Sequence, residues 1–246
     1  MKLFITSSPF VDGADRAIME PMNGLIRRLK EALPPYCRCL YVCSSPDRRD
    51  LNCTFGADIF QIFAQEGMPF SHYAVLDGEN GYEAGKLVRQ SDLIVLAGGH
   101  VPTQNAFFHR IHLPELLRDY DGVVLGISAG SMNMSGEVYA QPEEPGESGP
   151  EYQRFLPGLG LTDVNILPHY QKVKDYEVDG LGLFADITIP DSVGHCFFAL
   201  PDGSYIYQDE ESLLLCGEGY SICDGVMEQI SENGEVLNLN EEYDDF

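Results

Sequence analysis

The first half of the chain alternates short apolar runs with segments of helical periodicity. Runs that have the length and composition of buried strands are Leu3–Thr6, Cys39–Cys43, Tyr73–Leu76, Ser91–Leu96 and Gly122–Gly126. Segments between them with helical periodicity are Ile18–Leu33, Phe55–Phe63, Tyr82–Gln90 and Thr103–Leu117. Strands separated in this way by helices form βαβ units, whose strands pair in parallel. The sequence therefore predicts an α/β fold with a doubly wound, mostly parallel sheet.

The last third of the chain has a different pattern. The segments Gly194–Leu200 and Tyr205–Tyr207 flank a tight turn, which predicts a β-hairpin. Two further short strands are expected at Ser212–Cys216 and Ser221–Gln229. We expect this part to form an antiparallel β extension at the edge of the sheet. No internal repeat or linker divides the chain, so residues 1–246 are expected to form a single domain.

The charge of the chain restricts its partners. The net charge is −24, from 39 acidic and 15 basic residues. A uniformly negative field repels phosphates, which argues against nucleic acid and anionic membranes as partners. The segment Met1–Thr6 is too short for the apolar part of a signal peptide, and no apolar run approaches the roughly 18 residues that span a bilayer. These features predict a cytoplasmic protein, and they leave open whether it is a monomer or a homodimer.

The cysteines predict neither a disulfide framework nor a metal site. They are Cys37, Cys39, Cys43, Cys53, Cys196, Cys216 and Cys223. Their number is odd and several lie in apolar runs, so buried free thiols are expected. Cys37 and Cys39 have no second pair or histidine at zinc-binding spacing.

A serine between two glycines follows the last of the parallel strands. In Gly126-Ile127-Ser128-Ala129-Gly130, the apolar run ends and a segment that can open a helix begins. This pattern is typical of a nucleophile elbow, in which small neighbours leave the serine Oγ uncovered. The N–H of Ala129 would then lie where it can stabilise an oxyanion. An ordinary strand-to-helix turn with an inert serine is the alternative interpretation.

Two further features lie just after the C-terminal ends of predicted strands, as Ser128 does. Gly98 and Gly99 follow a buried strand and can bring backbone N–H groups close to a ligand. His169 follows Pro168 directly after the apolar run Val164–Leu167, which holds a general base rigidly. The order serine, acid, histidine is available if the acid is one of three glutamates in the polar loop 141–150. These are Glu143, Glu144 and Glu147.

Taken together, these pieces resemble the peptidase E (aspartyl dipeptidase) and cyanophycinase family of serine peptidases. The resemblance runs from about residue 92 to about residue 229. It is carried by four motifs in order: Gly98-Gly99-His100, Gly126-Ile127-Ser128-Ala129-Gly130-Ser131, Pro168-His169-Tyr170 and Leu200-Pro201-Asp202-Gly203. The family implies a class I glutamine amidotransferase-like fold, related to flavodoxin-like sheets, with a serine nucleophile and no cofactor.

Carried over by position, the resemblance assigns each catalytic role to a residue. Ser128 would be the nucleophile and His169 the general base, and the N–H groups of Gly99 and Ala129 would form the oxyanion hole. Glu143 or Glu144 is expected to orient the histidine.

The sequence departs from the family at two substrate-contacting positions. His100 stands where members usually carry asparagine, and Lys172 lies in a segment where peptidase E has an arginine that reads aspartate. We expect both residues to contact substrate, and lysine would bind a carboxylate only as a point charge. The resemblance predicts a serine peptidase that hydrolyses short peptides through an acyl-enzyme. An esterase or amidase on a small acyl compound, or a non-catalytic binding protein of the same fold, are the alternatives.

Overall fold

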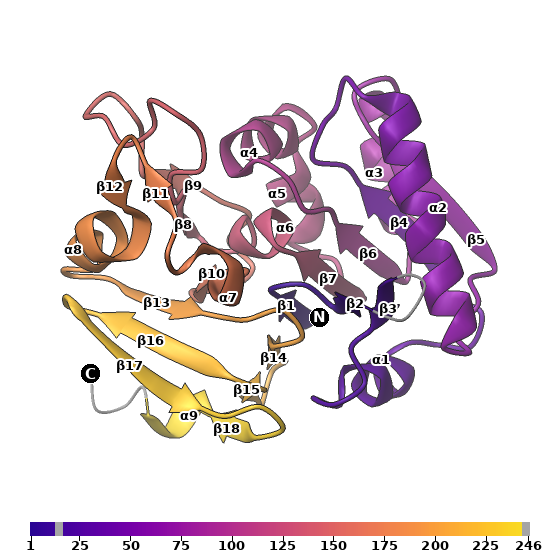
Figure 1. Ribbon diagram of the computed structural model, residues 1–246. Helices are drawn as coiled ribbons and strands as arrows, with labels where there is room; N and C mark the ends of the chain where they lie inside the picture. The colour runs from indigo at the N-terminus through magenta and orange to yellow at the C-terminus, as the bar shows by residue number, and fades with distance from the viewer. Residues whose placement is uncertain (13–16, 243–246) are drawn as a thin grey trace.

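A central sheet of mixed direction dominates the computed structural model, which describes residues 1–12 and 17–242. Its eight strands within these residues have the order β18-β15-β14-β1-β7-β6-β4-β5 (Figure 1). The parallel strands are β1 (Lys2–Thr6), β4 (Arg38–Val42), β5 (His72–Leu76), β6 (Leu93–Leu96) and β7 (Val123–Ile127). The antiparallel strands are β14 (Tyr205–Gln208), β15 (Leu213–Cys216) and β18 (Val236–Asn238). The expected mixed α/β fold with a mostly parallel sheet is confirmed.

A second sheet lies beside the central one, toward the C-terminal end of the chain (Figure 1). Its strands are β10 (Asn165–Leu167), β13 (Cys196–Ala199), β16 (Gly219–Cys223) and β17 (Val226–Ser231). Three short antiparallel pairs complete the strands: β2 (Phe10–Asp12) with β3 (Ala17–Met19), β8 (Glu137–Tyr139) with β9 (Phe155–Pro157), and β11 (Glu177–Val178) with β12 (Leu181–Gly182).

The helices connect the strands and cover the central sheet, and α2 crosses in front of β4 and β5 (Figure 1). In chain order the helical segments are α1 (Leu25–Ala32), α2 (Arg49–Gln65), η1 (Gly81–Glu83), α3 (Ala84–Arg89), α4 (Val101–Arg110), α5 (Leu113–Leu117), α6 (Ala129–Met132), α7 (Tyr170–Val173), the π-helical η2 (Leu183–Thr188), α8 (Ile189–Asp191) and α9 (Leu239–Glu242).

Burial explains why the central strands are apolar along their length. Leu93–Leu96 is buried on both faces, as is Val123–Gly126 in the neighbouring strand. Each fully buried Leu, Ile or Val side chain stabilises the fold by about 1.5–3 kcal/mol. Strands covered on both sides lose the alternation of apolar and polar residues that marks a half-exposed strand.

Three predicted helices have different limits in the structure. The first begins at Leu25 rather than at Ile18, because Ile18 pairs with Val11 in the β2–β3 hairpin. The helix expected to run to Leu117 is broken at His112, whose φ is 56°. Helix α2 begins at Arg49, six residues before the predicted start at Phe55.

The early start of α2 depends on a tertiary contact. Arg49 Nη1 donates to both carboxylate oxygens of Asp77 at 2.9 Å, and Asp77 is fully buried. Because Asp77 follows β5, this ion pair fixes the first turn of α2 to the end of that strand. Local periodicity carries no sign of such a contact.

The predicted hairpin around residues 201–204 is wrong. Strand β13 belongs to the second sheet, where it pairs with β10 and β16, whereas β14 pairs with β1 and β15 in the central sheet. The turn between them therefore crosses from one sheet to the other. It places Asp202 beside Ser7 at the end of β1.

The prediction that the cysteines are free is wrong for one pair. Cys196 and Cys223 stand opposite each other on β13 and β16 and form a disulfide. Cys53 is free but exposed, and the other four are free and buried. Within the described residues, no group of three or more His, Cys, Asp or Glu side chains is placed to hold a metal ion.

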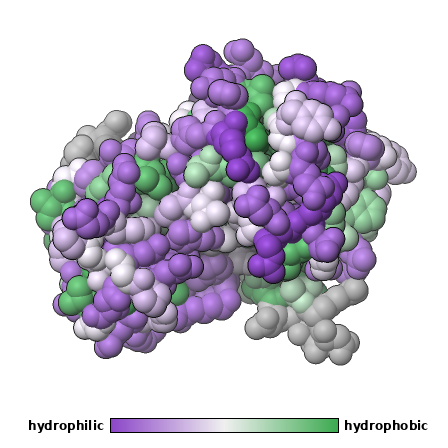
Figure 2. Space-filling model, turned by 90° about the horizontal axis from the view of Figure 1, so that it is seen from above, coloured by the Kyte–Doolittle hydropathy of each residue, from purple (hydrophilic) through white to green (hydrophobic). Residues whose placement is uncertain are grey.

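The surface seen in Figure 2 is mostly hydrophilic. Seen from above, hydrophilic residues cover most of this face, and the hydrophobic ones are divided into small areas (Figure 2). None of the helices in the described part of the chain combines the length and the apolar character that crossing a bilayer requires.

Candidate active site

Ser128 lies in the tight turn between β7 and α6. Its φ is 52° and its ψ is −115°, a conformation that an L-residue adopts only when the surrounding structure enforces it. The enforcing contacts come from the end of β1: the Ser128 N–H donates to the carbonyl oxygens of Thr6 at 3.1 Å and of Ser7 at 2.9 Å. This is the geometry expected of a nucleophile elbow.

The two glycines of the elbow motif are required by close packing. A Cβ on Gly126 would lie 2.6 Å from the Cα of Ser131, and one on Gly130 would overlap the carbonyl oxygen of Leu96 at the end of β6. Any larger residue would push α6 away from the sheet. The motif therefore has a structural reason as well as a chemical one.

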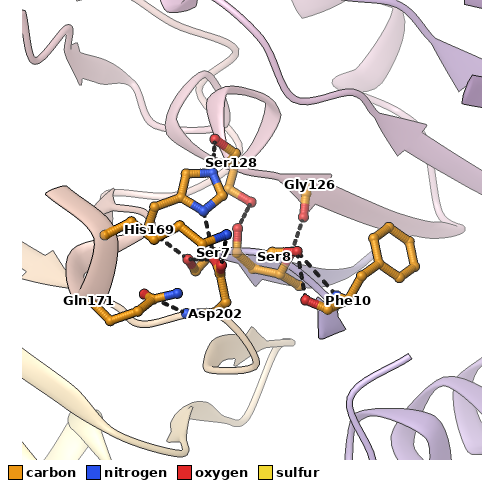
Figure 3. Close-up of polar contacts among 11 residues, drawn as sticks. Ser7, Ser8, Phe10, Gly126, Ser128, His169, Gln171 and Asp202 are labelled. Carbon is orange, nitrogen blue, oxygen red and sulfur yellow. Dashed lines mark hydrogen bonds and ion pairs between the residues drawn. The ribbon is translucent and has the colours of Figure 1, made fainter. Parts of the chain in front are cut away.

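His169 faces Ser128 from a different part of the chain. It follows β10 and Pro168, has a φ of 59°, and caps the start of α7. Its Nε2 lies 3.0 Å from Ser128 Oγ, although the two residues are 41 positions apart. Figure 3 shows the imidazole pointing at the serine hydroxyl. The structure thus brings together the candidate nucleophile and the candidate base.

The carboxylate beside His169 belongs to Asp202. Its Oδ1 lies 2.6 Å from His169 Nδ1 (Figure 3). An ionised carboxylate only accepts hydrogen bonds, so Nδ1 is the donor and Nε2 is left to accept the proton of the Ser128 hydroxyl. The expectation that Glu143 or Glu144 orients His169 is therefore corrected: neither contacts Nδ1, and the carboxylate that does comes after the histidine in the chain.

Asp202 stays ionised in this position. Burial by itself raises the pKa of its carboxyl, but hydrogen bonds from His169 and Lys172 outweigh that effect and hold the pKa well below its usual value. Lys172 Nζ lies 2.6 Å from Asp202 Oδ2. The lysine predicted to contact substrate is thus engaged with the acid, although its side chain remains 65% exposed.

The three glutamates of the loop 141–150 have other surroundings. Glu147 accepts hydrogen bonds from the backbone N–H groups of Glu143 and Glu144 and lies 3.0 Å from His100 Nε2. His100, whose other ring nitrogen contacts Thr103, does not line the pocket beside Ser128. Of these residues, only Glu143 lines that pocket.

Ser7 is a residue of the site that sequence reasoning missed. It follows β1, is fully buried, and its hydroxyl donates to Asp202 Oδ1 at 3.1 Å and accepts from the His169 N–H at 2.8 Å. Asp202 was missed as an acid because Pro201-Asp202-Gly203 has the composition of a turn. One sequence signal could have indicated both: each lies within two residues of the end of an apolar run, as Ser128 and His169 do.

Two backbone N–H groups adjoin the serine. Gly99 lines the pocket, and a Cβ at this position would overlap the Ser44 side chain. Ala129 is the first residue of α6, where a helix leaves its N–H groups without helical acceptors. In the part of the chain that the structure describes, neither N–H donates to a protein acceptor. Of the two residues, Gly99 lines the pocket and Ala129 is buried directly beside Ser128.

The pocket at these residues has a volume of about 380 Å³. Ser128, His169 and Gly99 line it, and it lies where β1, β6 and β7 end. A larger concavity of about 980 Å³ lies at the opposite ends of these strands, where they begin, and none of the residues of the site lines it. Crevices at the carboxyl ends of parallel strands are the usual ligand sites of such sheets.

The comparisons with known proteins bear on the fold. No protein-family model matches the chain, and no curated protein matches it. Among solved structures, the chain is similar to the crystal structure of a "Putative Peptidase E Protein" from Listeria monocytogenes EGD-e. The match covers 94% of this chain and 98% of the other, with a TM-score of 0.55 and 16% sequence identity. The chain therefore shares the fold of that protein over nearly its whole length.

Proposed function

We propose that this protein is a serine hydrolase that cleaves short peptides through an acyl-enzyme on Ser128. The observation that carries the proposal is the continuous line of contacts from Ser128 Oγ to His169 and from His169 to Asp202, at 3.0 Å and 2.6 Å. A serine becomes nucleophilic when a base accepts its proton and a third group orients that base. The shared fold with a protein described as a peptidase E supports the choice of peptides as substrates.

The first half of the reaction forms the acyl-enzyme. His169 Nε2 takes the hydroxyl proton of Ser128 while Oγ attacks the carbonyl carbon of the scissile bond. The N–H groups of Gly99 and Ala129 stabilise the resulting oxyanion. The tetrahedral intermediate then collapses, the C–N bond breaks, and His169 gives its proton to the leaving amine.

The second half hydrolyses the acyl-enzyme and releases the carboxylic acid product. Water gives a proton to His169 Nε2 and attacks the ester carbonyl, and the C–O bond to Ser128 breaks as Oγ recovers that proton. Asp202 stays ionised throughout and stabilises the positive imidazolium of His169. A pocket of about 380 Å³ suits a small acyl group better than an internal segment of a folded protein.

Covalent labelling tests the proposal. A fluorophosphonate probe should label the wild-type protein at Ser128, and labelling should disappear in Ser128→Ala. A panel of dipeptides and simple esters then identifies the bond cleaved. Labelling at another serine, or its persistence in Ser128→Ala, would overturn the proposed nucleophile, and hydrolysis of esters alone would exclude a peptidase.

A further inference from the structure

The pocket beside Ser128 has an apolar wall. Its polar members include the proposed catalytic groups and Gln141, whereas most of the remaining lining is hydrocarbon. The apolar lining residues are Met132, Pro142, Pro168, Val173 and Leu183, to which the ring of Tyr176 is added. Met132 and Leu183 are only 2% and 3% exposed, so this part of the wall is held in the core and does not rearrange freely. Such a surface favours an apolar side chain.

The charge inside the pocket has one sign. Glu143 lines the pocket, and no lysine or arginine of the described residues does so. Lys172 is the lysine that the sequence predicts to bind a substrate carboxylate, but its ammonium lies 2.6 Å from Asp202 Oδ2 and it does not line the pocket. A carboxylate entering this space would lose hydration without gaining a cationic partner.

The Glu143 carboxylate is itself available to a ligand. Only its backbone N–H has a partner, Glu147 Oε2, and within the described residues its carboxylate forms no hydrogen bond or ion pair. The residue remains exposed, yet the protein around it limits hydration. Burial, the largest cause, together with Glu147 and Glu144, raises its pKa to about 7, against the opposing effect of His100 and His169. A ligand ammonium would favour the ionised form.

We infer that the pocket selects short peptides whose first residue is apolar and carries a free α-amino group, and that it rejects an acidic first residue. The inference rests on the proposed function and names its substrate class. The apolar wall receives the side chain of the acyl residue, and Glu143 binds the ammonium. An aspartyl side chain is disfavoured because it meets hydrocarbon and a second carboxylate in place of a cation.

Steady-state kinetics on matched substrates tests the selection. Leucyl and aspartyl dipeptides with the same second residue are compared at pH 7.5, together with N-acetyl-leucyl versions. We expect kcat/KM for the leucyl substrate to exceed that for the aspartyl substrate by at least about tenfold. Glu143→Gln should lower kcat/KM for the free-amine substrate about tenfold, mainly through KM, and leave the acetylated substrate unchanged.

Glu144→Gln is the matched control, because it removes the same charge from the neighbouring position, which does not line the pocket. It should leave kcat/KM for both substrates unchanged. Faster cleavage of the aspartyl substrate would overturn the inference while leaving the proposed hydrolase intact. Equal effects of Glu143→Gln on the free and acetylated substrates would also overturn it.

Calorimetry on Ser128→Ala separates this inference from the proposed chemistry. If the wild-type protein cleaves no peptide, tighter binding of the leucyl dipeptide than of the aspartyl dipeptide to this variant would support the substrate class although the peptidase proposal fails. Binding of neither dipeptide, or tighter binding of the aspartyl one, would contradict the inference.

Discussion

The hydroxyl of Ser7 donates a hydrogen bond to the Asp202 carboxylate over 3.1 Å, across 195 positions of sequence. The Ser7 hydroxyl oxygen also accepts a hydrogen bond from the backbone N–H of His169 at 2.8 Å, and the Ser7 carbonyl oxygen accepts one from the Ser128 N–H at 2.9 Å. One buried residue at the end of β1 therefore contacts the three segments that carry the proposed nucleophile, base and acid (Figure 3). The alignment of these groups depends on it.

Ser7→Ala should lower kcat about tenfold with little change in KM. The substitution leaves the buried N–H of His169 without its acceptor and frees Asp202 on one side, so the imidazole loses its fixed direction. Steady-state kinetics on a hydrolysed dipeptide measures both constants. Ser8→Ala is the control, since within the described residues the Ser8 hydroxyl hydrogen-bonds only with the backbone of Phe10. A change in KM alone would contradict a positioning role for Ser7.

Asp202→Asn should reduce kcat by about three to four orders of magnitude, because an amide cannot hold His169 in the tautomer that accepts the serine proton. Circular dichroism checks that the variant is folded, and the rate of fluorophosphonate labelling at Ser128 reports the loss independently of substrate binding. The Glu144 carboxylate does not contact His169, so Ser128 in Glu144→Gln should be labelled at the wild-type rate. A labelling rate that falls more in Glu144→Gln than in Asp202→Asn would restore the glutamate as the acid.

Gly130→Ala should destabilise the fold and abolish labelling of Ser128. The added Cβ overlaps the carbonyl oxygen of Leu96, which is backbone and cannot move aside as a side chain can. We expect a loss of about 2 kcal/mol or more in the free energy of unfolding, measured by chemical denaturation. Gly136→Ala offers a matched control, because the nearest atom to its added Cβ is 4.0 Å away. Equal stability of the two variants would show that the elbow tolerates a side chain.

The preference for a free amine should increase as pH rises from 6 to 7.5. With a pKa of about 7, Glu143 changes from mostly protonated to mostly ionised over this interval, and only the ionised form attracts an ammonium. The charged and titratable groups around it are His100, Glu147, His169, Glu144 and Tyr152. The ratio of kcat/KM for the leucyl and N-acetyl-leucyl substrates cancels the titration of the catalytic groups. Above about pH 8 the ratio should fall, because the substrate amine itself loses its proton.

In Glu143→Gln that ratio should stay flat between pH 6 and 7.5. A ratio that rises equally in the variant would assign the titration to one of the other groups around Glu143. The measurement therefore separates Glu143 from its neighbours without requiring any of them to be substituted.

The sequence by itself determined the α/β architecture and the positions of the elbow and of the proposed base. These are local properties: Leu93–Leu96 is continuously apolar because the strand is buried on both faces, and Gly126 and Gly130 flank Ser128 because packing excludes a side chain at either position. His169 follows its strand and Pro168 directly, and its position is readable from that order alone.

Only the tertiary structure decided which carboxylate contacts His169, the partner of Lys172 and the contacts of Ser7. A turn such as 201–204 has the same composition whether it joins two strands of one sheet or crosses between two sheets. Only the pairing of β13 with β10 and β16, and of β14 with β1, shows that it crosses. Pairing is set by the burial of whole strands against each other over long separations in sequence. For that physical reason, the carboxylate that reaches His169 could not be chosen by counting residues along the chain.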